Sequence, residues 1–341
     1  SSEVNPIQPK FLDYKKDLTF GKTSNGLPVI MKQNAEDKLF DLQMRYEFGN
    51  EADTRYSYAA NYLDLLGTNK ISAEQIKQQF YKLACNFGIN VSEKNITVSL
   101  NGLAENMPQA IALAENVLKN AKTDKTAWKN FVAMVLKNRE DTKKEQKSNF
   151  NAVKAYGIYG TYNNVLNDLS TEQLQNTNPA DMVALIKKLS TYKHTVLYYG
   201  PATEKQLDNL ITKDHKTATK LADVPVNKPY MEQQTPKNEI LLAPYDAKNI
   251  YMTMYHNEGK MFNPAEAPVA AVFNEYFGGG MNTVVFQELR EARGLAYSAR
   301  AYYYNMPIKN HPQYGTTYII SQNDKMMDCI RVFKEILDTI P

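Results

Sequence analysis

The sequence predicts an α+β protein made of two tandem copies of one domain, each with an antiparallel-rich sheet and helices packed on one of its faces. A chain of 341 residues exceeds what one hydrophobic core usually takes. The order strand–strand–helix–helix–strand–strand–helix occurs twice, which indicates internal duplication. Residues 214–237 are rich in Lys, Thr, Pro, Asn and Gln, which is typical of a linker. The domains are therefore expected at 1–213 and 238–341.

The first copy alternates strands and helices that follow from local patterns. Apolar and polar residues alternate over 40–48, which predicts a half-buried strand. Ser72 and Gln75 stand at capping-box spacing and predict a helix start. The full set comprises strands at 27–31 and 40–48, helices at 56–66 and after Ser72, strands near 89–93 and 95–102, a helix at 106–119, long polar helices over 124–190, a strand at 194–199 and a helix near 203–213.

The second copy repeats this order. Its expected elements are strands at 239–242 and 250–256, a helix at 264–277, a glycine turn at 278–280, a helix at 283–292, strands near 296–304 and 316–321, and a helix at 324–340. The glycines lack the spacing of a phosphate-binding loop, so we interpret them as a sharp turn between helices, with Asn282 or Thr283 as N-cap. In the first copy a long stretch follows the helix at 106–119. The second copy has no such stretch, so its domain is expected to be incomplete and the chain a fragment.

Composition excludes several classes of protein. Forty basic and 37 acidic side chains leave a net charge of +3. This near-balance of charges does not indicate a basic surface for binding nucleic acid or a membrane. No apolar run reaches the roughly 18 residues of a spanning helix. Cys85 and Cys329, the two cysteines, cannot form a disulfide scaffold or a cysteine-built zinc site. The opening Ser-Ser-Glu-Val has no charged and apolar leader, so we expect no export signal in this segment.

Known catalytic motifs are missing from the sequence. The four histidines are His194, His215, His256 and His311, and no two have the spacing of a helix-borne zinc site. A zinc site built from three distant residues is disfavoured but stays open. His256 with Glu258 is a candidate acid/base pair, although a strand histidine beside a loop carboxylate is the favoured interpretation. The sequence has no G-x-S-x-G elbow, P-loop or Rossmann glycine pattern.

Arg290 and Tyr297 are the candidate functional residues. The side chains three and four positions from Arg290 are not acidic, so an intrahelical salt bridge is not expected and the guanidinium should face solvent, another element or a ligand. Tyr297 follows a helix-ending glycine at the start of a strand. A guanidinium and a phenol suit backbone carbonyls or a developing oxyanion. On spacing alone, a surface arginine and a packed strand tyrosine are favoured over this function.

Residues 274–298, which read NEYFGGGMNTVVFQELREARGLAYS, resemble the signature of the M16 (pitrilysin or insulinase) zinc metallopeptidases. In that family the signature belongs to the second domain of a two-domain half. The first-domain pattern is present more loosely at 25–30, 44–49 and 66–68, and the resemblance runs from about Leu18 to Pro341. It implies the M16 fold, of the LuxS/metallohydrolase-like type.

The resemblance also implies a function. A complete enzyme pairs two halves into a closing chamber, and one half carries His-x-x-Glu-His on its first long helix. The corresponding stretch, 56–68, has no histidine, so the chain resembles the zinc-free C-terminal half. No cofactor is expected in this chain, and zinc is expected on a catalytic M16 half, fused upstream or separate. Arg290 and Tyr297 match the family's pair, which implies substrate-backbone binding and transition-state stabilisation in peptide hydrolysis.

Further expectations follow from the resemblance. The partners are a peptide or unfolded polypeptide, with no nucleic acid and no membrane insertion, and the chain alone should neither bind zinc tightly nor cleave peptides. A bacterial periplasmic or envelope location fits such enzymes, and the cytoplasm stays open. Two alternatives remain: a degenerate scaffold half that only assembles with other subunits, and a peptide-binding module that captures extended chains along a sheet edge.

Overall fold

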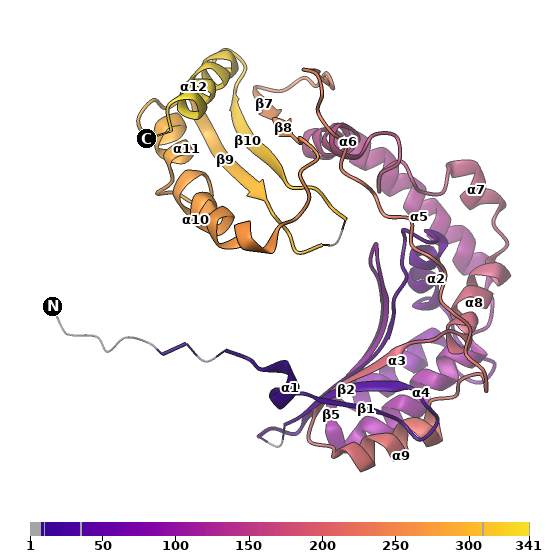
Figure 1. The fold of residues 1–341 in the computed structure, drawn as a ribbon. Coiled ribbons are helices and arrows are strands. Elements are labelled where there is room, and N and C mark those ends of the chain that lie inside the picture. The colour runs from indigo at the N-terminus through magenta and orange to yellow at the C-terminus, as the bar shows by residue number, and fades with distance from the viewer. Residues whose placement is uncertain (1–7, 10, 35, 309, 341) are drawn as a thin grey trace. The chain divides into compact units, whose positions relative to one another are not determined.

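The computed structural model describes residues 8–9, 11–34, 36–308 and 310–340 (Figure 1). The chain divides into two compact units. The first contains the chain up to Met134 together with Leu169–Pro229, and the second contains Val135–Asp168 together with the chain from Tyr230 onward. Residues 135–168, part of the stretch predicted as polar helices of the first copy, thus group with the second unit.

A six-stranded sheet forms the centre of the first unit, in the order β1-β2-β6-β3-β5-β4. Its strands are β1 (Thr19–Lys22), β2 (Pro28–Gln33), β3 (Leu39–Tyr46), β4 (Cys85–Val91), β5 (Ile96–Leu103) and β6 (Thr195–Gly200). β6 is parallel to β2, and all other neighbours are antiparallel. β6 therefore comes from far along the chain to lie between β2 and β3, two strands that are close in sequence (Figure 1).

All the helices described in this unit are α1 (Tyr14–Asp17), α2 (Arg55–Leu63), α3 (Ala73–Lys82), η1 (Ala104–Asn106), α4 (Met107–Asn120), α7 (Thr171–Asn176), α8 (Pro179–Lys188), η2 (Leu189–Thr191) and α9 (Glu204–Asp214), while α5 (Lys125–Lys143) begins in this unit. The helices α2, α3 and α4 contact the strands β4 and β5 of the sheet. The alternation in β3 buries Phe40, Leu42, Met44 and Tyr46, as its pattern predicts. Ser72 Oγ accepts from Gln75 N at 3.2 Å and Gln75 Oε1 accepts from Ser72 N at 2.8 Å, so the capping box is confirmed.

The second unit has a four-stranded antiparallel sheet in which β10 (Tyr314–Gln322) is central. β9 (Ala296–Tyr304) pairs with one edge of β10, and β7 (Asn249–Met252) and β8 (Tyr255–His256) pair with the other (Figure 1). The remaining elements are α6 (Gln146–Tyr159), η3 (Pro264–Glu266), α10 (Ala267–Phe277), α11 (Val284–Phe286), the π-helical turn η4 (Gln287–Glu291) and α12 (Met326–Asp338). A core of Phe277, Val285, Leu289, Ile319 and Phe333 joins α10, α11, η4 and α12 to the sheet. The predicted α+β class with helices on one sheet face is confirmed.

Two sequence-based expectations were wrong in detail. Residues 239–242 form no strand, and the side chains of Ile240 and Leu242 are each 83% exposed. A strand needs a neighbour for its backbone groups, and none of the described strands pairs with this segment. The strand predicted over 250–256 is split into β7 and β8. Among the described residues, every helix is too short or too polar to cross a bilayer.

Candidate functional site

The glycine turn at 278–280 positions the segment that carries Arg290. A Cβ on Gly278 would lie 2.2 Å from the Ala301 carbonyl oxygen, so only glycine allows this approach to β9. Thr283 occupies the N-cap position of α11, and its hydroxyl donates to Gly280 O at 2.6 Å. Of the two predicted N-caps, Thr283 is therefore the residue at that position, although its side chain bonds the turn and not a helix N–H.

Arg290 lies in the π-helical turn η4. Ala292 N donates to Gln287 O at 2.8 Å, five residues back, which inserts one residue relative to an α-helix. Leu289 is fully buried, and the adjacent Arg290 side chain is 44% exposed. The expectation that Arg290 lacks a local partner was wrong, because it considered only positions three and four residues away. The Glu291 carboxylate lies 3.7 Å from Arg290 Nε, and the guanidinium stands 4.8 Å from the Phe286 ring centroid.

These contacts leave the guanidinium with hydrogen-bonding capacity. The 3.7 Å distance between Arg290 and Glu291 is too long for a hydrogen bond, so the two side chains form a solvent-exposed ion pair. Such a pair stabilises a protein by about 0–1 kcal/mol. Within the described part of the chain, no acceptor is within hydrogen-bonding distance of Arg290. Its N–H groups are thus available to a carbonyl or carboxylate from outside.

Tyr297 stands at a β-bulge near the start of β9. Ser298 pairs with Ile320 while Ala296 pairs with Ser321, so Tyr297 is the additional residue and has no partner on β10. Its side chain is 75% exposed, and no described residue hydrogen-bonds its hydroxyl. Gly294, with φ +57°, ends the preceding turn, as the sequence predicts. The interpretation of Tyr297 as a packed strand tyrosine is therefore not what the structure shows.

Arg290 and Tyr297 lie on consecutive elements, η4 and β9, and neither is sealed in the core. Arginine keeps its charge in proteins, and a phenol donates one hydrogen bond. Together they offer a cationic donor and a neutral donor to an oxygen-rich ligand. The sequence signal located both residues, whereas the π turn and the bulge had no signal that we recognised.

The second candidate pair, His256 and Glu258, is exposed. His256 Nε2 lies 3.1 Å from Glu258 Oε1, and the two side chains are 69% and 76% exposed. Thr235 Oγ1 is 3.3 Å from His256 Nδ1. A strand histidine beside a loop carboxylate is the arrangement that the sequence favours here.

Two histidines far apart in sequence meet inside the first unit, which sequence spacing did not reveal. His194 Nε2 lies 2.8 Å from His215 Nε2, and His215 Nδ1 lies 2.6 Å from Glu115 Oε1. Both histidines are buried, at 5% and 4% exposure. Burial, assisted by the neighbouring His215, lowers the pKa of His194 to about 4. A cavity of about 360 Å³ adjoins His215 and Glu115.

The contacts of this histidine pair determine which ring nitrogens donate and which accept hydrogen bonds. His194 Nδ1 lies 2.8 Å from Tyr192 O, which only accepts, so Nδ1 carries the hydrogen and Nε2 must accept. His215 Nε2 therefore donates to His194, and His215 Nδ1 contacts the Glu115 carboxyl group. Every ring nitrogen already has a partner within the protein. No group of three or more His, Cys, Asp or Glu side chains in the described residues is placed to hold a metal ion.

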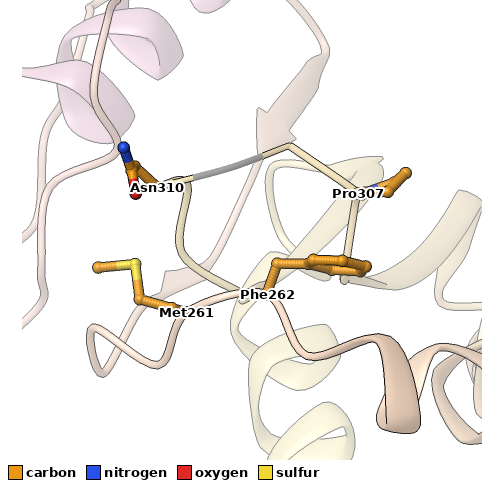
Figure 2. Close-up of a pocket in the computed structure, with 4 residues that line it drawn as sticks. All are labelled: Met261, Phe262, Pro307 and Asn310. Atoms are coloured by element: carbon orange, nitrogen blue, oxygen red, sulfur yellow. The ribbon is translucent and has the colours of Figure 1, made fainter.

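A further cavity of about 380 Å³ lies in the second unit, between the segment before η3 and the connection from β9 to β10 (Figure 2). Met261, Phe262, Pro307 and Asn310 line it, with the Phe262 ring on the same side as Pro307 in Figure 2. These side chains include no acid, base or nucleophile, so the cavity adds no catalytic group.

Comparisons with known proteins give a family for the C-terminal part and a fold for nearly the whole chain. Residues 178–340 match the family described as Peptidase M16 inactive domain. The chain is similar to the M16 inactive domain from Pseudomonas fluorescens, with 17% identity, a TM-score of 0.74, and coverage of 95% of this chain and 80% of that one. No curated protein matches the sequence.

Two larger proteases share the fold. The periplasmic protease PqqL from Escherichia coli is 16% identical with a TM-score of 0.74, and the match covers 99% of this chain but 37% of PqqL. The ferredoxin protease FusC, solved as a mutant in complex with Arabidopsis ferredoxin, is 12% identical with a TM-score of 0.76, and the match covers 98% of this chain and 38% of FusC. This chain thus corresponds in length to well under half of either protease.

Proposed function

We propose that this chain, whose residues 178–340 match the M16 inactive domain and whose fold is that of M16 proteins, is the zinc-free half of an M16 zinc metalloendopeptidase. In this proposal it forms one wall of the closing chamber. Arg290 and Tyr297 bind the substrate backbone and stabilise the transition state of peptide-bond hydrolysis. Its partner is a catalytic M16 half, fused upstream or separate, and its substrate is a peptide or unfolded polypeptide.

The observation that carries this proposal is the exposure of two hydrogen-bond donors on consecutive distorted elements. The guanidinium of Arg290 is 44% exposed and the side chain of Tyr297 is 75% exposed. An exposed arginine resting on an aromatic ring keeps one orientation without having its N–H groups occupied. Such preorganised donors are what an oxyanion or a peptide carbonyl needs.

The chemistry assigned to this chain is positioning and charge stabilisation. Zinc, when bound on the partner half, supplies an activated water, and this chain has no residues that would hold the ion among those described. Arg290 donates to a carbonyl of the substrate backbone and fixes its register. The Tyr297 hydroxyl donates to the scissile carbonyl oxygen as negative charge develops there, and it is not deprotonated in the process.

The test is Tyr297→Phe in the complete enzyme, with Tyr302→Phe as the matched control. Tyr302 is on the same strand and 46% exposed, so its variant removes an equivalent hydroxyl from the same surface. Loss of a transition-state donor typically costs about 10²- to 10³-fold in kcat, and we expect this for Tyr297→Phe alone. Unchanged turnover with unchanged peptide affinity would reject the role.

A non-catalytic scaffold or peptide-binding subunit of the same fold is the alternative. The local contacts of Arg290 with Phe286 and Glu291 favour it, because they hold the guanidinium without any ligand. A zinc motif upstream in the same polypeptide, or in a separate subunit that binds this chain, would distinguish the enzyme half from the scaffold.

Peptide capture along the edge of β9 is disfavoured. Ala301 N donates to Gly278 O at 3.3 Å, and the side-chain amide of Asn274 bonds both Tyr303 N and Tyr303 O, at 2.8 and 2.9 Å. Ala299 is only 1% exposed. The outer edge of β9 is therefore already covered by the end of α10 and the glycine turn, and no strand can add there.

A further inference from the structure

The cavity of about 360 Å³ beside the buried histidines lies entirely within the first unit. Its walls come from β3 and β5, from α4 and α8, and from residues 215–218 at the end of α9. A cavity of about 150 Å³ in another protein holds a benzene molecule, so this one has room for a ligand with several more carbon atoms. The role proposed for Arg290 and Tyr297 makes no use of it, since both residues belong to the second unit.

The walls next to the sheet are apolar. Met44 on β3, Leu100 on β5 and Ile186 on α8 line the cavity, and each is at most 2% exposed. Leu118 on α4 lines it as well and is half-buried. An apolar group placed here exchanges contacts with water for contacts with these side chains, which is favourable. These walls therefore suit a hydrocarbon chain.

Tyr46, the last residue of β3, adds an unpaired polar group to the cavity. It is 2% exposed, and its ring centroid stands 4.8 Å from that of His194. No described residue hydrogen-bonds its hydroxyl, although buried polar groups normally have a partner. Burial, assisted by the negative charge of Glu115, raises the pKa of Tyr46, so the phenol keeps its proton. The cavity thus offers one hydrogen-bond donor to an oxygen atom of a ligand.

The charged residues that line the cavity favour an anion. Lys119, Lys187 and Lys216 line it together with one acidic residue, Glu115, among the described residues. Lys119 on α4 and Lys187 on α8 are exposed, and neither ammonium group donates to a described residue. Glu115 is not available to a cation, because its two oxygens lie 2.6 Å from His215 Nδ1 and 3.4 Å from Lys216 N. The free charge of the cavity is therefore positive.

We propose that this cavity binds a small amphipathic carboxylate of the medium-chain fatty acid type. Its hydrocarbon chain lies between the sheet and the helices α4 and α8. One carboxylate oxygen accepts from the Tyr46 hydroxyl, and the ammonium groups of Lys119 and Lys187 balance its charge. A protein partner is disfavoured, because the unpaired hydroxyl belongs to a residue that is 2% exposed and lies below the reach of a flat surface.

Isothermal titration calorimetry of the 1–341 chain with octanoate, below the concentration at which it forms micelles, tests the proposal. The comparison probes are 1-octanol, which is neutral, and octylammonium, which is a cation with the same chain length. We expect saturable binding of one octanoate per chain and at least about tenfold weaker binding of the other two probes. Absence of saturable octanoate binding would overturn the proposal. Equal binding of 1-octanol would overturn the assignment of an anion to the cavity.

Tyr46→Phe tests the hydroxyl separately from the fold. Because no described residue bonds this hydroxyl, its removal should leave the thermal midpoint of the ligand-free chain close to that of the wild type. The affinity for octanoate should fall about tenfold, since a hydrogen bond to a charged oxygen is lost. Wild-type affinity in this variant would contradict the assigned donor.

Lys187→Gln and its matched control Lys188→Gln test the charge. Lys188 is the next residue of α8, but its ammonium group stands 5.6 Å from the Tyr192 ring centroid and it is outside the residues that line the cavity. We expect Lys187→Gln to weaken octanoate binding about threefold and Lys188→Gln to leave it unchanged. Equal effects of the two variants would mean that the carboxylate binds elsewhere and would overturn the site.

Discussion

The buried histidine pair predicts an acid-sensitive stability of the first unit. Burial lowers the pKa of His194 from 6.5 to about 4. Its Nδ1–H donates to Tyr192 O and its Nε2 accepts from His215, so the neutral ring is the form that fits this site. In the unfolded chain the same ring binds a proton near its ordinary pKa. The unfolded state therefore binds more protons than the folded state between pH 6.5 and pH 4.

The sign and the size of the effect follow from this difference. The stabilising contribution of a neutral His194 is fully present above about pH 6.5 and is lost progressively as the pH falls towards 4. At about 1.4 kcal/mol per pKa unit, the loss in unfolding free energy amounts to about 3 kcal/mol. This is a large fraction of the roughly 5–15 kcal/mol that typical domains possess.

Urea unfolding followed by tryptophan fluorescence measures this loss in the first unit. Trp128 is the single tryptophan, is 5% exposed, and packs edge-on against Tyr62 at 5.0 Å between ring centroids. Its emission therefore reports on the first unit. Unfolding curves are recorded from about pH 8 to about pH 4.5 for the wild type, His194→Gln and His256→Gln. His256 is the matched control, because its side chain is 69% exposed.

Carboxylates elsewhere destabilise all three proteins in acid, so the comparison is between slopes. The wild type and His256→Gln should lose stability together below about pH 6.5, while His194→Gln should lose less over the same range, whatever its stability at the alkaline end. A His194→Gln profile that runs parallel to the wild type throughout this acidic range would refute the reasoning. Such a result would mean that the ring is protonated in the folded protein without cost.

Three other predictions concern the second unit. Gly278→Ala should lower the unfolding free energy by about 2 kcal/mol or more in thermal denaturation, because its Cβ would clash with the Ala301 backbone. The control Gly280→Ala, whose Cβ would have no atom within 4 Å, should leave the unfolding free energy nearly unchanged. Equal effects of the two variants would contradict this packing. Arg290→Lys in the complete enzyme should raise KM or lower kcat without changing the thermal midpoint, because the lysine ammonium group cannot make the paired hydrogen bonds of a planar guanidinium. Unaltered kinetics would count against a role of Arg290 in substrate binding. Added zinc should leave the thermal midpoint of the 1–341 chain unchanged and give it no peptidase activity, and a shift saturating at micromolar zinc would show that the chain holds a site of its own.

Local sequence patterns predicted most elements because each depends on interactions within a few residues. Alternation placed β3, and the capping box placed the start of α3 at Ser72. The failures depend on partners far away in the chain. Residues 239–242 have the composition of a strand, but a strand exists only with a neighbour. The contact between His194 and His215 requires the end of α9 to return to the start of β6, which no local spacing encodes.

The candidate site illustrates the same division. The residue types and their spacing in the segment with Arg290 and Tyr297 were visible in the sequence, so the two residues could be named as candidates. Their exposure was not predictable, because it depends on how η4 and β9 meet the rest of the sheet. Ser321, for example, is 1% exposed on the helix-covered face and pairs with Ala296, a register that only the folded sheet defines.

That register explains why the phenol of Tyr297 is exposed. In a regular ladder Tyr297 would stand opposite Ser321 and face the core, together with Ala299 and Ala301. The bulge gives this inward place to Ala296, which is 6% exposed, and leaves Tyr297 75% exposed. The π turn likewise inserts one residue beside Arg290, and one residue rotates a helical side chain by about 100°. Each distortion gives up regular hydrogen bonding to turn one polar side chain outward. Two such distortions on consecutive elements therefore favour a binding role over a purely structural one.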